Sequence, residues 1–360
     1  MKDKTSVLII DDSAFMRKSL SLMLESDPSI SVVGTARNGL EGYEQTIKLK
    51  PDIITLDIEM PVMDGLTALK KIMANCPTSV IMVSSLTSEG ADATLKALEL
   101  GAVDFIPKEM SYVSVNISQI RNDLIFKVKE IAKQKQLTER LNRIRTINYK
   151  PQTVLRTTNV LKDLPMIGYR AISLGISTGG PFTLQRILPM LSKNLPVPIF
   201  IVQHMPPKFT KSLADRLNGL CQLEVKEAES GESVRPGVIY IAPGGMHMKI
   251  KSNGINNLLV NITKEPSDTL HRPSVDVMMN SVNEFYGKYN LGVIMTGMGK
   301  DGLEGIKNLK SLGGYSIAQN EETSVVYGMP KAIVDAGLAD VVLPAEKISE
   351  LINRVVLNGK

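Results

Sequence analysis

A glycine-rich turn with a serine is the first part of this chain that could carry chemistry. Residues 175–180 read Gly-Ile-Ser-Thr-Gly-Gly and fit the pattern G-x-S-x-G, in which a sharp strand-to-helix turn exposes the serine, here Ser177. Backbone N–H groups at the start of the following helix can then stabilise an oxyanion. The same turn could instead cradle a phosphate, or Ser177 could simply cap a helix. The motif alone therefore leaves these alternatives open.

A nucleophilic serine needs a base, and the chain has only three histidines, His204, His247 and His271. A single histidine is more often a surface or capping residue, but His204 directly follows an expected strand. Asp301 lies in the glycine-rich segment after another expected strand, where it could also be a helix N-cap. Together Ser177, His204 and Asp301 predict an acyl-transfer site with a nucleophile, a base and an orienting carboxylate. Their order along the chain differs from the Ser–Asp–His order of α/β-hydrolases, which argues against that fold.

Two backbone N–H groups are candidates for the oxyanion hole of this site. Thr178 follows the expected nucleophile, and Met298 lies in the turn before Asp301. Donors in these places can bind the negative charge that develops on a carbonyl oxygen during acyl transfer. We expect this chemistry to need no cofactor.

A second group of candidates consists of carboxylates that follow strands near the N-terminus. Asp11, Asp12 and Asp57 converge if these strands form one parallel sheet, and a divalent cation such as Mg2+ relieves their repulsion. With a metal bound, one carboxylate can act as a nucleophile toward phosphorus. Ser84 and Lys108, which follow two later strands, could then bind the oxygens and charge of a phosphoryl group. Any one of them could be a plain helix cap, but all five in strand order favour a phosphoryl site.

The elements that must position these residues alternate between strands and helices. Alternation of this kind predicts βαβ units and parallel sheets covered on both faces. We expect strands at 6–10, 31–33, 52–56, 79–83 and 102–106, and then at 171–175, 197–202, 221–227, 238–241, 291–295 and 315–318. Between the later strands we expect helices at 181–191, 211–217, 274–285 and 304–310, and a hairpin at 246–262 that turns at Asn253-Gly254. The sequence therefore predicts two doubly wound α/β domains.

The charge distribution separates these two domains. The 360 residues carry a formal net charge of +5, but residues 127–162 alone contain ten Lys or Arg and two Glu. This places the boundary in a basic helical connector and leaves neither flank basic. The two cysteines, Cys76 and Cys221, form no disulfide framework, which fits a reducing cytoplasm. We expect no secretory signal and no membrane-spanning segment.

The first 125 residues resemble a response-regulator receiver domain. The resemblance rests on Asp11-Asp12, on the segment 56–65 around Asp57, on Val83-Ser84-Ser85 and on Phe105-Ile106-Pro107-Lys108. It implies a flavodoxin-like fold with a parallel five-stranded sheet and Asp57 as the phospho-acceptor. It also implies that Asp11, Asp12 and Asp57 hold Mg2+, and that Ser84, Lys108 and Phe105 sense the phosphate.

Nearly the whole chain resembles the chemotaxis protein-glutamate methylesterase (CheB) family. The motifs are Gly-Ile-Ser-Thr-Gly-Gly (175–180), Gln-His-Met-Pro-Pro (203–207), Tyr-Ile-Ala-Pro-Gly-Gly (240–245), His-Arg-Pro-Ser-Val-Asp (271–276), Met-Thr-Gly-Met-Gly-Lys-Asp-Gly (295–302) and Ile-Ala-Gln-Asn (317–320). The resemblance implies a receiver domain at 1–125, a basic helical linker at 126–164 and a methylesterase catalytic domain at 165–360.

This family resemblance implies a cytoplasmic, phosphorylation-activated serine hydrolase. Its substrates would be glutamate γ-methyl esters, and also glutamines, on methyl-accepting chemotaxis receptors. A chemotaxis histidine kinase would be the phosphoryl donor, and the unphosphorylated receiver would act as an inhibitory lid. The alternative is a receiver-controlled protein that binds DNA through the basic connector or a nucleotide through the glycine-rich turn. The connector has no recognition-helix motif and only one aromatic residue, Tyr149, so we expect no nucleic-acid partner.

Overall fold

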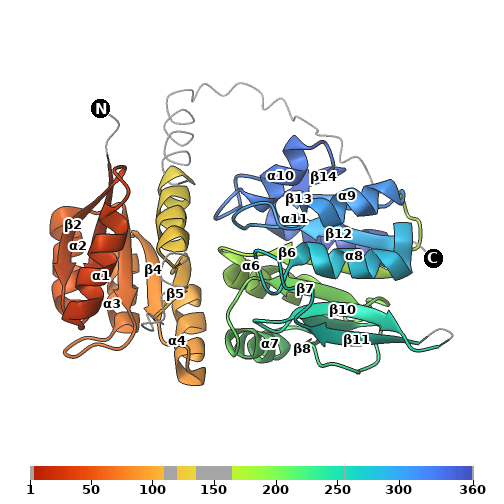
Figure 1. Ribbon diagram of the computed structural model, residues 1–360, viewed down its shortest axis with the longest axis horizontal. Coiled ribbons are helices and arrows are strands. Elements are labelled where there is room, and N and C mark those ends of the chain that lie inside the picture. The colour runs from red at the N-terminus through yellow and green to blue at the C-terminus, as the bar shows by residue number, and fades with distance from the viewer. Residues whose placement is uncertain (1–3, 109–119, 135–163, 255–256, 359–360) are drawn as a thin grey trace. The chain divides into compact units, whose positions relative to one another are not determined.

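The chain folds into two compact units, Met1–Asn142 and Arg143–Lys360. The computed structural model describes residues 4–108, 120–134, 164–254 and 257–358. Both units contain a parallel sheet with helices on its two faces, as the alternation of strands and helices predicts (Figure 1). Within the described ranges, no helix is both long enough and apolar enough to cross a bilayer.

The first unit is built on a five-stranded parallel sheet in the order β2-β1-β3-β4-β5. Its elements are β1 (Thr5–Ile10), α1 (Ala14–Glu25), β2 (Ile30–Ala36), α2 (Gly39–Leu49), β3 (Ile53–Asp57), α3 (Gly65–Asn75), β4 (Ser79–Ser84), α4 (Ser88–Glu99) and β5 (Asp104–Pro107), followed by a helix at residues 120–134. Strand β3 lies in the middle and is buried along its whole length, which explains its continuous apolar run.

The helix at residues 120–134 is attached to the last strand of this sheet. The Lys127 ammonium lies 3.0 Å from a carboxylate oxygen of Asp104 and donates to the backbone oxygen of Phe105, also at 3.0 Å. Of the predicted connector at 126–164, residues 126–134 therefore belong to a helix that packs on the first unit. Residues 135–163 lie outside the described residues, and the predicted domain boundaries stay predictions.

The second unit is built on a seven-stranded parallel sheet in the order β14-β13-β12-β6-β7-β9-β8, with a separate antiparallel pair β10-β11. Its strands are β6 (Ala171–Ile176), β7 (Ile199–Gln203), β8 (Glu224–Glu227), β9 (Val238–Ile241), β10 (His247–Ser252), β11 (Leu258–Thr263), β12 (Asn290–Ile294), β13 (Tyr315–Gln319) and β14 (Val341–Leu343). Its helices are α6 (Gly180–Ile187), α7 (Phe209–Leu220), α8 (Val275–Tyr286), α9 (Leu303–Ser311), α10 (Met329–Asp335) and α11 (Ala345–Leu357), with short 3-10 turns at Leu188–Met190 and Gly287–Tyr289.

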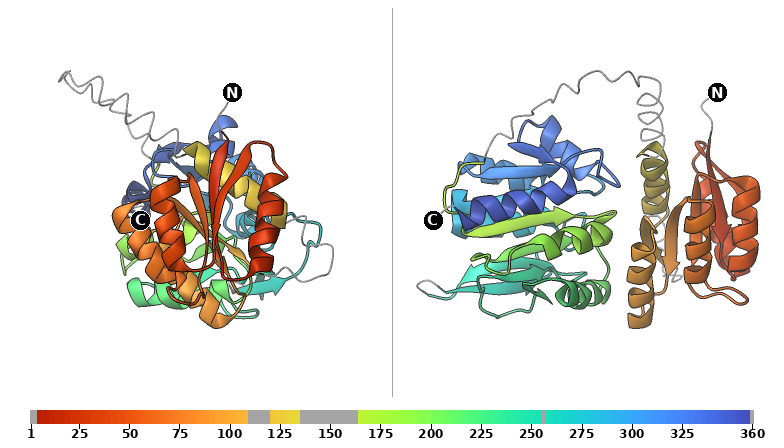
Figure 2. Two further views of the ribbon diagram at one scale, coloured as in Figure 1. Left: turned by 90° about the vertical axis from the view of Figure 1, so that its left-hand side faces the viewer. Right: turned by 180° about the vertical axis from the view of Figure 1, so that it is seen from behind.

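Helices cover both faces of the seven-stranded sheet. Helix α8 lies in front of the sheet in Figure 1, whereas α11 lies in front of it in the reverse view of Figure 2. Strands β6 and β7 occupy the middle of the sheet, where all of their side chains are buried. The chain therefore enters its glycine-rich turn from a rigid central strand.

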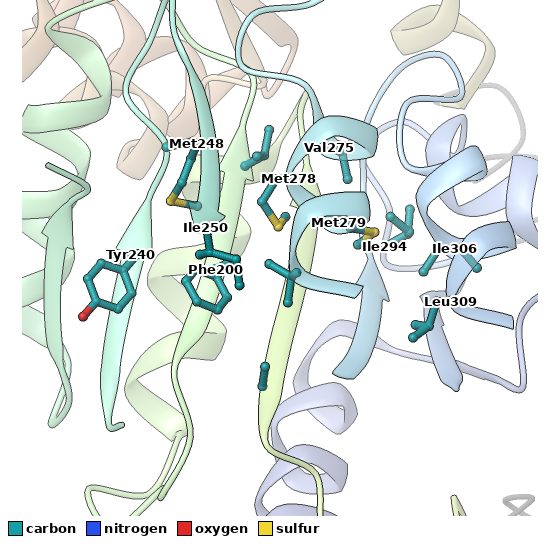
Figure 3. Close-up of a cluster of buried hydrophobic side chains, with 14 of the residues drawn as sticks. Phe200, Tyr240, Met248, Ile250, Val275, Met278, Met279, Ile294, Ile306 and Leu309 are labelled. Carbon is teal, nitrogen blue, oxygen red and sulfur yellow. The ribbon is translucent and has the colours of Figure 1, made fainter. Parts of the chain in front are cut away.

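Apolar side chains of α8 and α9 pack together over β12. Met279 of α8 and Ile306 of α9 are fully buried, and Ile294 of β12 lies between these helices (Figure 3). Met248 and Ile250 extend the same cluster to the hairpin strand β10. This packing fixes the two helices relative to each other.

The structure contains every strand expected from the sequence, although several ends move by one to three residues. The expected hairpin is present as β10 and β11, and Gly254 in its turn has a φ of +90°, a conformation that glycine adopts readily. The sequence analysis missed strand β14 and helices α10 and α11. Strand β14 has only three residues, one of them exposed, so its apolar pattern is too short to recognise.

Candidate active site

Three neighbouring strands bring Ser177, His204 and the segment before Asp301 to one edge of the seven-stranded sheet. Ser177 follows β6, and His204 follows β7, with Ile176 paired to Gln203 at the strand ends. The backbone N–H of His204 donates to Ile176 O at 3.2 Å, and that of Ser177 donates to the backbone oxygen of Thr296, after β12, at 2.9 Å. Residues far apart in sequence thus meet because the carboxyl ends of parallel strands share an edge.

His204 and Asp301 form a direct hydrogen bond. The His204 Nε2 atom lies 2.8 Å from Asp301 Oδ2, and both side chains are about nine-tenths buried. This contact leaves Nδ1 as the ring nitrogen that can accept a proton from a hydroxyl, the reverse of the arrangement in chymotrypsin-like proteases. Within the described part of the chain, no hydrogen bond joins the Ser177 hydroxyl to His204. The His271 ring stacks on His204, with 4.3 Å between the ring centroids.

Asp301 is held by the N-terminus of α8. Its Oδ2 atom accepts the backbone N–H of Val275 at 2.7 Å, and its Oδ1 atom accepts that of Asp276 at 3.0 Å and the Ser274 hydroxyl at 2.9 Å. Burial opposes ionisation of Asp301, but the hydrogen bond and charge of His204 and these N–H groups outweigh it, so its pKa lies well below its usual range. The carboxylate therefore stays charged beside the imidazole.

Gln203 connects the backbone of the serine to that of the histidine. Its side chain is 2% exposed, and its Nε2 atom donates to Ser177 O at 2.9 Å and to His204 O at 3.2 Å. Its Oε1 atom is buried without a hydrogen-bond partner in the described structure. A Cβ atom on Gly180 would lie 1.9 Å from that oxygen, so a larger residue at this position of α6 would force the Gln203 amide to move.

The candidate oxyanion donors lie next to Ser177. A Cβ atom on Gly297 would lie 2.8 Å from Ser177 Cβ, which shows how closely the turn carrying Met298 approaches the serine. Among the described residues, neither the N–H of Thr178 nor that of Met298 donates to a protein acceptor. The Thr296 hydroxyl donates to Thr178 O at 2.9 Å and thereby ties the two turns together. Both N–H groups are thus available beside Ser177.

The first unit brings its predicted carboxylates together at the carboxyl ends of β1 and β3. Oxygens of Asp11, Asp12 and Asp57 lie within 4.8 Å of one another. Burial, followed by the charge of Asp57, raises the pKa of Asp11 to about 6. Burial also raises the pKa of Asp57, although the Lys108 ammonium opposes this shift.

This carboxylate cluster fits a hard divalent cation. Asp11 Oδ2 and Asp57 Oδ2 are both buried without a hydrogen-bond partner in the described structure. Carboxylate oxygens of this kind are the ligands that Mg2+ prefers, and exposed Asp12 leaves one side open to water. A cation there would satisfy the orphaned oxygens and remove their mutual repulsion.

Of the residues expected to sense a phosphate, Lys108 contacts the carboxylate cluster directly. Lys108 Nζ lies 2.6 Å from Asp57 Oδ1. The Ser84 hydroxyl is buried and accepts a hydrogen bond from the Thr94 hydroxyl at 2.7 Å. The Phe105 ring is 5% exposed and lies under the Lys127 ammonium, 5.9 Å from its centroid. Lys108 therefore contacts the carboxylate directly, whereas Ser84 and Phe105 are packed against neighbouring helices.

Sequence reasoning missed several residues that shape the site around Ser177. Gln203 and Ser274 stand inside recognised motifs, but only their contacts show that they hold the serine and Asp301. Thr296 likewise gave no signal beyond being a small polar residue in a glycine-rich turn. His247 was weighed as a base, but it is fully buried and its Nδ1 atom accepts the backbone N–H of Ser274 at 3.2 Å. Its place in the structure is beneath the start of α8.

Each of the two units matches a known protein family. The response regulator receiver domain pattern matches residues 7–117, and the CheB methylesterase pattern matches residues 172–352. The chain is 50% identical over 365 residues to protein-glutamate methylesterase/protein-glutamine glutaminase 1 of Oleidesulfovibrio alaskensis, with 97% of this chain and 99% of that protein covered. A protein of the same kind from Thermotoga maritima is 47% identical over 355 residues, covering 97% of this chain and 98% of that protein.

A solved structure resembles the second unit. The crystal structure of the Thermotoga maritima CheB methylesterase catalytic domain has 47% sequence identity and a TM-score of 0.51, and it covers 52% of this chain and 99% of that domain. The order of sequence motifs, the fold of both units and these near-full-length matches agree with one another. This chain therefore belongs to the CheB family of protein-glutamate methylesterases, with a receiver domain ahead of its methylesterase domain.

Proposed function

We propose that this protein is a phosphorylation-activated serine hydrolase that removes methyl groups from glutamate γ-methyl esters on chemotaxis receptors. The observation that carries the proposal is the buried His204–Asp301 hydrogen bond beside Ser177 at the edge of the central sheet. Deamidation of receptor glutamines is the same acyl transfer with ammonia as the leaving group. Both activities appear in the names of the relatives.

In the proposed reaction, Ser177 Oγ attacks the γ-carbonyl carbon of the substrate while its proton passes to His204 Nδ1. Asp301 holds the imidazole through Nε2 and stabilises the imidazolium that forms. The N–H groups of Thr178 and Met298 bind the developing oxyanion. The imidazolium then protonates the departing methoxy oxygen, methanol leaves, and water hydrolyses the acyl-enzyme by the same route in reverse.

The receiver would control this reaction through Asp57. Asp11, Asp12 and Asp57 would hold Mg2+, which supplies charge neutralisation for phosphoryl transfer when it is bound. Asp57 would accept the phosphoryl group from a chemotaxis histidine kinase, and Lys108 would exchange its present ion pair with Asp57 for one with the phosphate. Phosphorylation would then shift the protein toward its active state. The proposal places the protein in the cytoplasm, where such a kinase and the methylated parts of receptors would meet it.

Methanol release from methylated receptor tests the catalytic assignment. Ser177→Ala should abolish release in the full chain while Asp57 still accepts a phosphoryl group. Asp57→Asn should retain basal release but lose any stimulation by a small-molecule phosphoryl donor with Mg2+. Methanol release at the wild-type rate by Ser177→Ala would refute the nucleophile. Steep salt-dependent binding to duplex DNA by a protein whose serine does not react with a phosphonate would instead favour the DNA-binding alternative.

A further inference from the structure

At the candidate active site, the N-termini of α8 and α9 are capped reciprocally: a carboxylate at the start of each helix accepts N–H groups at the start of the other. Asp301 precedes α9 and accepts hydrogen bonds from the start of α8, through the N–H groups of Val275 and Asp276. Asp276, in the first turn of α8, reaches back to the start of α9. Its Oδ1 atom accepts the N–H of Gly302 at 2.9 Å and that of Gly305 at 2.7 Å. The first turn of α8 and the segment just before α9 thus each supply a carboxylate that accepts unpaired N–H groups at the start of the other helix.

Helix α9 has no side-chain cap of its own. Its N-cap is Gly302, which has no side chain to accept a hydrogen bond and has a φ of +100°. The Asp276 carboxylate takes the place of that missing cap from a different helix. Since Gly302 directly follows Asp301, the bond to its N–H fixes the backbone on the C-terminal side of Asp301.

We infer that Asp276 is a positioning residue of the hydrolase site, which holds the Asp301 loop so that the carboxylate stays beneath His204. This inference rests on the proposed function of Ser177, His204 and Asp301. Among the described residues, Asp276 forms no hydrogen bond with the His204 imidazole; its carboxylate accepts the N–H groups of Gly302 and Gly305. It acts through the loop, while the apolar contact between α8 and α9 keeps the two helix ends in register (Figure 3).

The electrostatics around Asp276 allow its charge to be distinguished from its geometry. Burial, and then the nearby Asp301 charge, raises the pKa of Asp276 to about 6, although the Gly305 N–H opposes the shift. The other titratable or charged residues near this pair, or next to it in sequence, are His204, His247, His271, Arg272, Lys300 and Glu304. When it is ionised, Asp276 adds a negative charge close to the His204–Asp301 pair.

Two substitutions separate the hydrogen-bond acceptor from the charge. Asp276→Ala removes the acceptor for Gly302 and Gly305, and we expect kcat for methanol release to fall about 10- to 100-fold with KM changed less than about 3-fold. Asp276→Asn keeps an acceptor oxygen and should restore kcat to within about 3-fold of wild type. The Asn variant should also move the acidic limb of the kcat/KM profile about half a pH unit lower, because the imidazolium loses a nearby negative charge.

Asp340→Asn serves as the matched control. Asp340 also accepts a backbone N–H, that of Ser316 at 2.8 Å, but at the start of β13, the opposite end of the strands from Ser177. It should leave kcat and the pH profile unchanged. Wild-type kcat in Asp276→Ala would overturn the inference. So would an Asn variant as slow as the Ala variant. If the Ala variant fails to fold, kcat of the Asn variant decides: a loss of more than about tenfold, with the acceptor oxygen retained, would overturn the inference.

Labelling of Ser177 by a phosphonate separates this inference from the proposed substrate. If wild-type protein is labelled but releases no methanol from methylated receptor, the proposed substrate is wrong. In that case the rate of Ser177 labelling replaces kcat: the Ala variant should be labelled about 10- to 100-fold more slowly than wild type and the Asn variant within about 3-fold, and wild-type labelling of the Ala variant would overturn the positioning role. If wild-type protein is not labelled at all, both proposals are wrong.

Discussion

Replacing Gln203 tests whether its amide holds the nucleophile and the base in register. Gln203→Met keeps the length of the side chain but removes both hydrogen bonds to the Ser177 and His204 carbonyls. Gln203→Glu keeps the shape even more closely but turns the donating nitrogen into an oxygen. That oxygen would face two carbonyl oxygens at 2.9 and 3.2 Å in a site that is 2% exposed.

The structure predicts a small change in the free energy of unfolding for the Met variant and a large loss for the Glu variant. In the Met variant, losing two hydrogen bonds costs about 2 kcal/mol. This loss is offset by removing the unpartnered Oε1 atom, whose burial costs about 1–3 kcal/mol. The Ser177 carbonyl also keeps the Gly180 N–H at 2.8 Å. The Glu variant must either bury a charge or stay protonated at a pH where glutamate is normally ionised. Its free energy of unfolding should therefore fall by about 3 kcal/mol or more.

Calorimetry of the full chain measures this difference. The transition of the second unit is the one that phosphonate labelling of Ser177 should shift. It should change by no more than about 4 °C in Gln203→Met but fall by about 6–12 °C in Gln203→Glu at pH 8. The kcat for methanol release should fall at least about tenfold in the Met variant, because the two reacting residues lose their shared anchor.

Asn290→Leu provides a matched control for the Gln203 variants. Asn290 is an equally buried amide, but it lies at the start of β12 and bonds Ser173 and Asn283. Its replacement should lower the transition temperature and leave kcat unchanged. A Glu variant as stable as the Met variant would refute the assigned orientation of the Gln203 amide, and an unchanged kcat in the Met variant would refute its positioning role.

Further predictions concern both sites. Asp301→Asn should lower kcat about 10³- to 10⁴-fold, because an amide cannot accept the hydrogen bonds that both oxygens receive and cannot orient His204; steady-state methanol release would show it, and a loss below tenfold would contradict the triad. Folding raises the pKa of Asp11 from 3.8 to about 6. Between these pH values the folded protein keeps a proton on Asp11 that the unfolded chain has lost. The metal-free first unit should therefore lose thermal stability as the pH rises from 4 to 6, and millimolar Mg2+ should restore it at pH 7; calorimetry that finds the reverse trend would exclude the buried carboxylate cluster. In Gly65→Ala the new Cβ would lie 1.9 Å from the Asp57 carbonyl oxygen, so phosphorylation by a small-molecule donor should be lost or slowed at least about tenfold, and normal phosphorylation would show that the loop can yield.

The sequence predicted the arrangement of both sites at the level of strands. Parallel strands end at a common edge, so the residues after β6, β7 and β12 had to converge once the strands were recognised. The strands were recognisable because each central one is a short, continuously apolar run. The same reasoning located Asp57 at the end of β3 and Lys108 after β5.

The contacts that refine the site could not be predicted in this way. Which nitrogen of His204 faces Asp301 depends on a side-chain rotation that no spacing determines. The double role of Gln203 depends on a glycine across the turn, at Gly180, and on two carbonyls that any residue would provide. The exchange between Asp276 and Asp301 requires the crossing of α8 and α9, which is set by packing between segments far apart in sequence.

The central position of β6 and β7 has a consequence for how this enzyme loses activity. Strands flanked on both sides open only when the whole unit unfolds, whereas edge strands such as β8 and β14 can fray at low free-energy cost. The proposed serine and base follow the strands whose amide protons we expect to exchange last. Heat inactivation should therefore follow the cooperative unfolding of the second unit, and fraying of the edge strands β8 and β14 should leave turnover intact.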